Sequence, residues 1–286
     1  MTISRIVSLL FSWIWLLLFS IMPLGIILVI ALARPADTVP PFGFAADTGN
    51  FMIAATDRLY RAAFWLSLRT ASVSTVVCLL IGYPMALGIT RASERWRGPL
   101  LLALMLPFWT GFLMRINAWI GMLRDDGWIN AALTFLGFAP ARLLYTDTAL
   151  YIGMVYTYLP FMVLPVYARL TKLDATLLEA AADLGASPFR AFLRVTLPLS
   201  VPGIAAGVAL VFIPAVGEYV IPELLGGPGA QLIGRVMWEE FFENRDWPMA
   251  SSLAWALLMV LVAVPVCVRA AVRAARGKRR LQPVSR

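Results

Sequence analysis

The chain has 286 residues and a formal net charge of +8; 60% of its residues are hydrophobic and 14% are charged. Soluble chains contain about 45–50% apolar residues, so this composition, with a mean hydropathy of +0.80, excludes an ordinary soluble domain and indicates a polytopic membrane protein. The absence of histidine excludes histidine metal ligands, histidine bases and serine–histidine triads within the chain.

Six apolar segments are long enough to cross a bilayer, which requires about twenty residues. They predict an all-α fold with transmembrane helices at 11–33, 65–90, 100–123, 149–170, 202–225 and 251–268. The first segment is longer than a signal-peptide core, so we expect an uncleaved helix. The sequence shows no internal repeat and no separate soluble domain. Residues 1–286 are therefore predicted to form a single transmembrane domain.

Basic residues gather on one side of these spans. They are Arg5 near the N-terminus, Arg91, Arg95 and Arg97 between spans two and three, Arg169, Lys172, Arg190 and Arg194 after span four, and the tail from Arg269 onward. The positive-inside rule therefore predicts cytoplasmic termini, and the charge needs no nucleic-acid partner. The basic tail could alternatively bind anionic membrane lipid. The opposite loops hold most of the acids, among them Asp125, Asp126, Glu239, Glu240 and Glu243.

Residues 173–203 form a long polar interruption between the fourth and fifth spans. Asp174 occupies an N-cap position before an alanine-rich helix, and Gly185 is placed to end it. Ser187 and Pro188 suit the cap and first turn of a second helix. The sequence thus predicts two short helices joined by a tight bend.

Within this loop a spaced motif is formed by Glu179, Ala180, Ala181, Gly185, Val195, Leu197 and Pro198. It is similar to the EAA signature of bacterial ABC-importer permeases, except that Val195 replaces the usual Ile. The resemblance implies a type I importer permease fold with a cytoplasmic coupling helix that docks on a separate ATPase. An ordinary amphipathic surface helix is the open alternative. The residues assigned to coupling are Glu179, Ala180, Ala181, Asp183, Gly185, Val195, Leu197 and Pro198.

Further segments resemble the first permease subunit of spermidine/putrescine-type importers. They include Gly82-Tyr83-Pro84, Leu106-Pro107-Phe108-Trp109, residues 158–165 and residues 217–227. This resemblance implies a bacterial inner-membrane importer with a second homologous permease, an ABC ATPase dimer and a solute-binding protein. It favours a polyamine as the solute. Another small organic solute stays open, as does a secondary transporter driven by an ion gradient.

The chain is not expected to be an enzyme or to hold a metal or cofactor. Gly226-Gly227-Pro228-Gly229 lacks the Lys and Ser or Thr of a phosphate-binding loop, so ATP hydrolysis is assigned to a partner. Cys78 and Cys267 lie inside apolar spans without ligand-spaced companions and are interpreted as small core residues.

Two charged residues lie deep within predicted spans, where an unpaired charge is costly. We hypothesise that Glu218 and Arg115 face the translocation path near an external gate and pair in one of its two access states, with Arg69 as a rival partner of Glu218. A purely structural ion pair is the alternative. Aromatic and acidic residues suited to a cationic solute complete the predicted path: Trp109, Tyr156, Tyr158, Tyr219 and Glu223.

Overall fold

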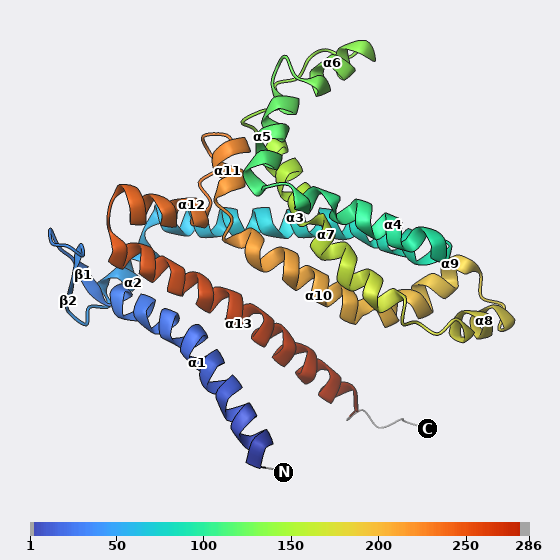
Figure 1. Ribbon diagram of the computed structural model, residues 1–286, viewed down its shortest axis with the longest axis horizontal. Helices are drawn as coiled ribbons and strands as arrows, with labels where there is room; N and C mark the ends of the chain where they lie inside the picture. Colours follow the sequence, from blue (N-terminus) through green and yellow to red (C-terminus); the bar gives the residue numbers. More distant parts are fainter. Residues whose placement is uncertain (1–2, 281–286) are drawn as a thin grey trace. The chain divides into compact units, whose positions relative to one another are not determined.

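The computed structural model describes residues 3–280, with side chains for residues 10–263. The side chains of Arg5, Cys267 and the basic tail lie outside the described residues. Most of the described chain is helical (Figure 1). It divides into two compact units, one formed by Trp65–Arg235 and the other by the segments before and after it.

Within the described residues, four helices are long and apolar enough to cross a membrane, or five if a bent pair counts as one span. These helices confirm the first, second and fourth predicted spans. Most of the helix ends lie within a few residues of the predicted ends. The four are Leu10–Ala31 within α1 (Ile3–Ala31), α3 (Arg58–Arg91), α7 (Asp147–Leu170), and the segment Pro188–Val216.

The predicted span at 100–123 is not a continuous helix. In its place α4 (Glu94–Met105) and the 3-10 turn η1 (Leu106–Trp109) are followed by α5 (Phe112–Leu123) and α6 (Trp128–Phe135), with a bend of 91° between the two halves. Both the backbone N–H and the hydroxyl of Thr110 donate to the carbonyl of Pro107, which closes the turn. Pro107 has no backbone N–H of its own to continue a helix.

The predicted fifth span, 202–225, is also interrupted. Its helix α10 (Leu197–Val216) ends before Gly217, and α11 (Val220–Leu225) begins after Tyr219. The predicted sixth span lies within α13 (Trp247–Arg280), of which the apolar part with described side chains is Trp247–Ala263.

One unit contains α1, α2 (Gly49–Thr56), the π-helical turn η3 (Glu239–Glu243) and α13, and α13 packs against both α1 and α2. A two-stranded antiparallel hairpin, β1 (Ala33–Pro35) and β2 (Phe42–Phe44), pairs Ala33 with Phe44. The all-α prediction did not include it. The carboxylate of Asp47 fixes the segment after the hairpin by accepting from Arg34 Nε at 2.7 Å and from the Gly49 N–H at 2.8 Å.

In the other unit α7 packs along α10. A Cβ on Gly203 would lie 2.6 Å from Arg169 Cβ and 2.8 Å from the Pro165 carbonyl, so only glycine permits this approach. The hydroxyl groups of Tyr83 and Ser200 lie 3.1 Å apart and join α3 to α10. The short helix α12 (Ile233–Trp238) follows α11.

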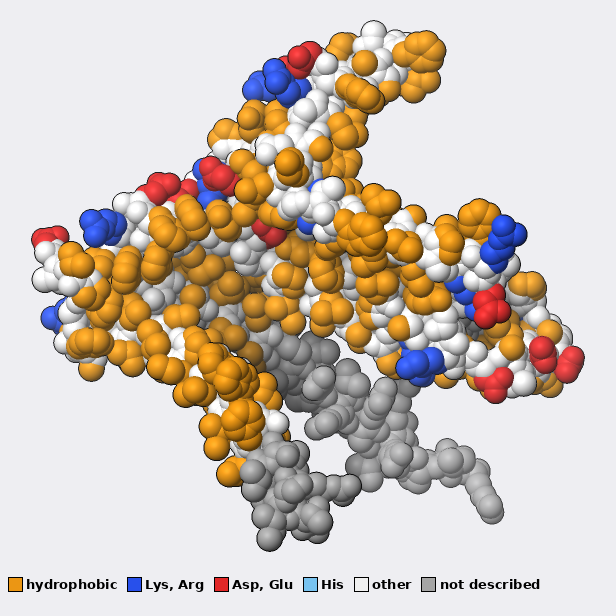
Figure 2. All heavy atoms as spheres, in the orientation of Figure 1, with side chains coloured by type: hydrophobic (Ala, Val, Ile, Leu, Met, Phe, Trp, Pro, Cys, Tyr) orange, Lys and Arg blue, Asp and Glu red, His pale blue; other side chains and the backbone are white. Residues whose placement is uncertain are grey.

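Hydrophobic side chains cover much of the visible surface of the helices, as Figure 2 shows. Leu80 and Ile81 on α3 and Leu210 and Ile213 on α10 are examples of large apolar side chains left exposed. Apolar faces of this kind suit contact with lipid chains, because a bilayer solvates them without cost.

Candidate functional site

Glu218 stands in the break between α10 and α11, where both of its carboxylate oxygens are engaged. Oε2 accepts a 2.6 Å hydrogen bond from the Tyr158 hydroxyl on α7. Oε1 accepts from the backbone N–H of Val220 at 3.1 Å and of Ile221 at 3.5 Å. The side chain is half-buried. The break therefore supplies free backbone donors that hold a carboxylate beside α7.

Three aromatic rings lead from this carboxylate to Arg115. The Tyr158 and Phe161 ring centroids are 6.3 Å apart, and those of Phe161 and Phe108 are 5.5 Å apart. Arg115 Cζ lies 4.6 Å from the Phe108 centroid and 5.7 Å from that of Phe112. We refer to Tyr158, Phe161 and Phe108 as the aromatic row.

Arg115 and Glu218 are not paired with each other in this structure. The Nε and Nη1 atoms of Arg115 are buried and have no hydrogen-bond partner among the described residues. The guanidinium instead rests on aromatic faces. Because α5 follows the 91° bend, the number of residues from the start of the span does not measure the depth of Arg115. Pairing in one access state stays a prediction.

The other predicted path residues are dispersed. Glu223 forms an ion pair of 2.8 Å with Arg235, a partner that we did not identify from the sequence. Trp109 and Arg69 are exposed, and Tyr219 is half-buried in the break beside Glu218. Arg235 lies in a predicted loop on the side of the membrane that holds most of the acids. A basic residue among those acids was the sequence signal that could have identified it as an ion-pair partner.

The first half of the predicted coupling loop forms α8 (Thr176–Asp183), which ends as the sequence predicts. Gly185 has φ +76°. Its N–H donates to the carbonyl of Ala182, and the Ala186 N–H donates to that of Ala181. These two bonds are the Schellman pattern, and the left-handed backbone favours glycine.

At the start of α8, Asp174 lies one residue before the cap position. Its Oδ1 accepts from the Thr176 N–H at 3.0 Å, and this backbone hydrogen bond holds the pKa of the Asp174 carboxyl below its usual range. No residue of α8 is buried, and Glu179 and Asp183 are exposed. Leu184 and Phe189 just after it are 88% and 71% exposed. This is an apolar surface without a partner in the described chain.

The second half of the loop does not form a separate short helix. Ser187 precedes α9 (Pro188–Ala191), which continues through the π-helical turn η2 (Phe192–Thr196) directly into α10. The Leu197 N–H donates to the Phe192 carbonyl, five residues earlier, and Pro198 has no N–H to donate. The Leu-Pro end of the motif therefore coincides with a local change of helix register.

The backbone is similar to those of solved importers. A bacterial ABC transporter for alginate import matches with a TM-score of 0.70 at 18% identity, covering 98% of this chain and 96% of that one. The MetNI methionine ABC transporter matches with a TM-score of 0.57 at 16% identity, covering 77% and 97%. At these identities the likeness shows the fold, which is that of an ABC-importer permease.

A family model described as binding-protein-dependent transport system inner membrane component matches residues 2–280, and the chain belongs to this family. It is 39% identical to the spermidine/putrescine transport system permease protein PotB of Haemophilus influenzae, covering 89% of this chain and 88% of the relative. PotB of Escherichia coli K12 is also 39% identical, covering 86% and 90%. The inner-membrane ABC transporter permease protein YdcU of Escherichia coli K12 is 31% identical, covering 70% and 69%.

Membership of this family makes the chain a transport permease of the inner membrane rather than an enzyme. In the part of the chain that the structure describes, no group of three or more Cys, Asp or Glu side chains is placed to hold a metal ion.

Proposed function

We propose that this permease forms the translocation path of an ATP-driven importer for a polyamine such as spermidine or putrescine. The observation that carries the proposal is the Glu218 carboxylate, held in a helix break at the end of the aromatic row. The identity of about 40% to spermidine/putrescine permeases, over most of the chain, supports the same solute class.

A solute ammonium group needs an anion and electron-rich faces to replace its water. Glu218 offers the anion. Phe161 offers a ring face to the cation, and Phe108 offers one once Arg115, which rests on it in this structure, has moved away. Tyr158 holds the carboxylate in place, since its hydroxyl donates to Oε2. In this proposal Arg115 pairs with Glu218 in the other access state and competes with the solute for it. Arg69, Trp109, Tyr219 and Glu223 line the approaches.

For coupling, we propose that α8 and the exposed Leu184 and Phe189 dock on an ABC ATPase dimer. The support is an apolar surface beside the charged Glu179, together with the EAA-like motif. With this role the loop and both termini lie in the cytoplasm. The proposed topology has six spans. A second homologous permease and a solute-binding protein complete the assembly.

Reconstituted vesicles test the function. The permease, its partner subunits and the binding protein should import radiolabelled spermidine only with ATP on the ATPase side. Uptake driven by an ion gradient without ATP would contradict the importer. ATP-driven uptake of another solute, with spermidine and putrescine inert, would contradict the polyamine assignment alone.

A further inference from the structure

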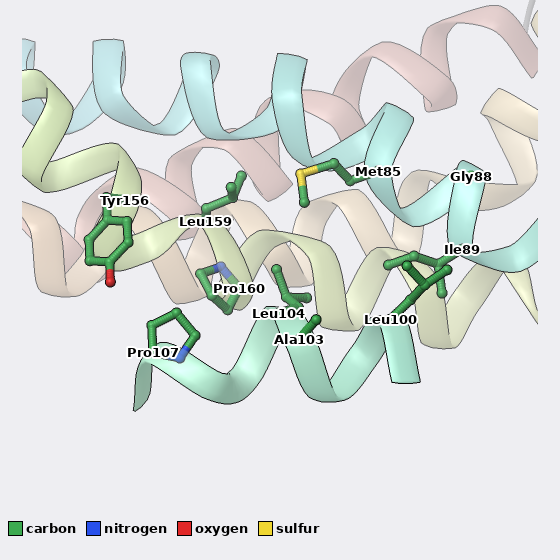
Figure 3. A pocket seen from close by; sticks show the side chains of 10 residues that line it. All are labelled: Met85, Gly88, Ile89, Leu100, Ala103, Leu104, Pro107, Tyr156, Leu159 and Pro160. Atoms are coloured by element: carbon green, nitrogen blue, oxygen red, sulfur yellow. The ribbon is translucent and has the colours of Figure 1, made fainter. Parts of the chain in front are cut away.

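A cavity of about 520 Å³ lies between α3, α4 and α7, and Glu218 is not among its lining residues (Figure 3). Its volume is that of a small-molecule site, for which about 300–1,000 Å³ is usual. The lining is almost wholly apolar and contains no acid. It includes Met85, Ile89, Leu100, Leu104, Leu159 and Pro160.

The cavity is elongated, and its two ends differ. In Figure 3, Ile89 and Leu100 lie at one end, and Pro107 and Tyr156 lie toward the other. Tyr156, the polar side chain of the lining, packs edge-on against the Trp119 ring at 5.3 Å. An apolar space of this kind does not hold ordered water, which needs two or more polar partners.

Arginines lie just beyond the Ile89 and Leu100 end. Arg91 follows Ile89 by two residues and Arg97 precedes Leu100 by three, which is about 3–5 Å along each helix axis. Arg97 Nε donates to the Ala92 carbonyl at 3.0 Å, so its guanidinium is fixed at the turn between α3 and α4. Arg95 is exposed in the same turn. With Glu94 as the one acid, three positive charges and one negative give residues 91–97 a net charge of +2.

We propose that this cavity holds one acyl chain of an anionic phospholipid, with the lipid phosphate against Arg91, Arg95 and Arg97. The apolar lining accepts a hydrocarbon chain, and the arginines accept the adjoining phosphate. The same arginines repel a polycation, which disfavours the proposed solute at this end of the cavity. The site goes beyond the transport function and does not depend on which solute is carried.

Lipid charge, rather than hydrocarbon burial, determines the selectivity of this site. An acyl chain is solvated equally well in the bilayer, so entering the cavity adds little preference by itself. The headgroup contributes the difference, and each clustered arginine near an anionic lipid strengthens binding about fivefold. The expected order is therefore phosphatidylglycerol before phosphatidylethanolamine.

Photo-crosslinking in the assembled transporter tests this. Nanodiscs of phosphatidylethanolamine would carry a trace of phosphatidylglycerol, or of phosphatidylethanolamine, with a photoreactive group on one acyl chain. Mass spectrometry then locates the labelled peptides. We expect several-fold stronger labelling of α3, α4 and α7 lining peptides by the phosphatidylglycerol probe, and competition by unlabelled phosphatidylglycerol.

Two variants separate the chain site from the headgroup site. Ala103→Trp fills the cavity and should abolish lining labels with either probe, whereas Ala132→Trp on α6 should not. Replacement of Arg91, Arg95 and Arg97 by Gln should remove the preference for phosphatidylglycerol, whereas Arg124→Gln should keep it. All of these positions are exposed or half-buried, so the variants are expected to fold.

Equal labelling by the two probes in the wild-type protein would overturn the proposal. So would lining peptides that are protected in the assembled transporter but labelled in the isolated chain, because a helix of a partner subunit would then occupy the cavity.

Discussion

The Tyr158 hydroxyl and the Glu218 carboxylate are joined by a 2.6 Å hydrogen bond between α7 and the break that follows α10. A hydrogen bond to a charged acceptor is short and contributes about 1.5–3 kcal/mol. The bond ties a residue within a membrane-length helix to one between two helices, so the position of the carboxylate depends on both.

Removal of this bond should impair transport without removing the protein from the membrane. We expect Tyr158→Phe to lower the initial rate of polyamine import about tenfold, because the carboxylate loses its fixed orientation. Glu218→Gln should lower it further, and the double variant should be no worse than Glu218→Gln alone. Uptake into vesicles measures this, with Tyr167→Phe on the same helix as control. Strictly additive losses would contradict a shared role.

Arg115 provides a separate test of the gate. If Arg115 and Glu218 pair in the other access state, the losses from Arg115→Gln and Glu218→Gln will be non-additive, with a coupling of about 0.5–3 kcal/mol. Arg124→Gln, an exposed arginine after α5, is the control. Additive import losses in the double variant would show that the two residues act independently.

The exposed apolar surface after α8 should be required for coupling. Leu184→Asp or Phe189→Asp places a charge on a surface that is 88% or 71% exposed, so the permease should fold normally. We expect that the ATPase no longer co-purifies with either variant and that transport no longer stimulates ATP hydrolysis. Leu136→Asp, at another exposed leucine, controls for the added charge. Undiminished ATPase binding by both variants would exclude this docking surface.

Gly185→Ala should disturb the same loop through the backbone. Alanine in the left-handed conformation costs about 1–2 kcal/mol, so the end of α8 should shift while the spans stay intact. The ratio of solute imported to ATP hydrolysed should fall, and normal coupling in this variant would contradict the importance of the bend.

The close approach of α7 and α10 makes Gly203 critical for stability. A Cβ at position 203 would lie 2.6 Å from Arg169 Cβ, and Gly203→Val adds two methyl groups to that Cβ. Such overpacking costs about 1–3 kcal/mol. Thermal unfolding of the purified permease should show a lower midpoint. Gly121→Ala, where nothing lies within 4 Å of the added Cβ, should leave the midpoint unchanged or raise it.

Asp246, before α13, should make stability depend on acidic pH. Burial raises the pKa of its carboxyl above the ordinary value of 3.8; the nearby Glu240 also raises it, while the Met249 N–H, which donates to Oδ1, opposes the shift. The folded state therefore binds the proton more tightly, and the free energy of unfolding falls as pH rises from 3.8 through the folded pKa.

The variant Asp246→Asn keeps an acceptor for Met249 and removes the titration. Its unfolding midpoint should vary less with pH over this range and should exceed that of the wild type near neutrality. Asp126→Asn, an exposed acid elsewhere, is the control. A pH profile identical to that of the wild type would contradict this role of Asp246.

Long apolar segments were predictable because length and hydropathy suffice to define them, as α1, α3 and α7 show. Pro107 indicates a kink in this segment, but the size of the 91° bend after η1 does not follow from the sequence, because prolines also occur in continuous membrane helices. Likewise Gly217 follows the apolar run of α10 but was read as part of the span. For Glu218 the sequence predicted a charged partner, with Arg115 or Arg69 as the candidates. Its partners in the structure are Tyr158 and the backbone of α11, and sequence spacing could not reveal contacts between segments far apart.

The helix is continuous from Pro188 to Val216 and contains the π-helical turn η2 near its start. The proposed docking loop adjoins one end of this helix, and Glu218 stands two residues beyond the other. A π-helical turn contains one residue more than an α-helical turn. If this extra residue shifts along the helix past a given position, the helix at that position rotates by about 100° and advances by about 1.5 Å. In the proposed coupling role, a movement of the docked loop that shifts this turn by one residue would therefore rotate the end of the helix that precedes Glu218.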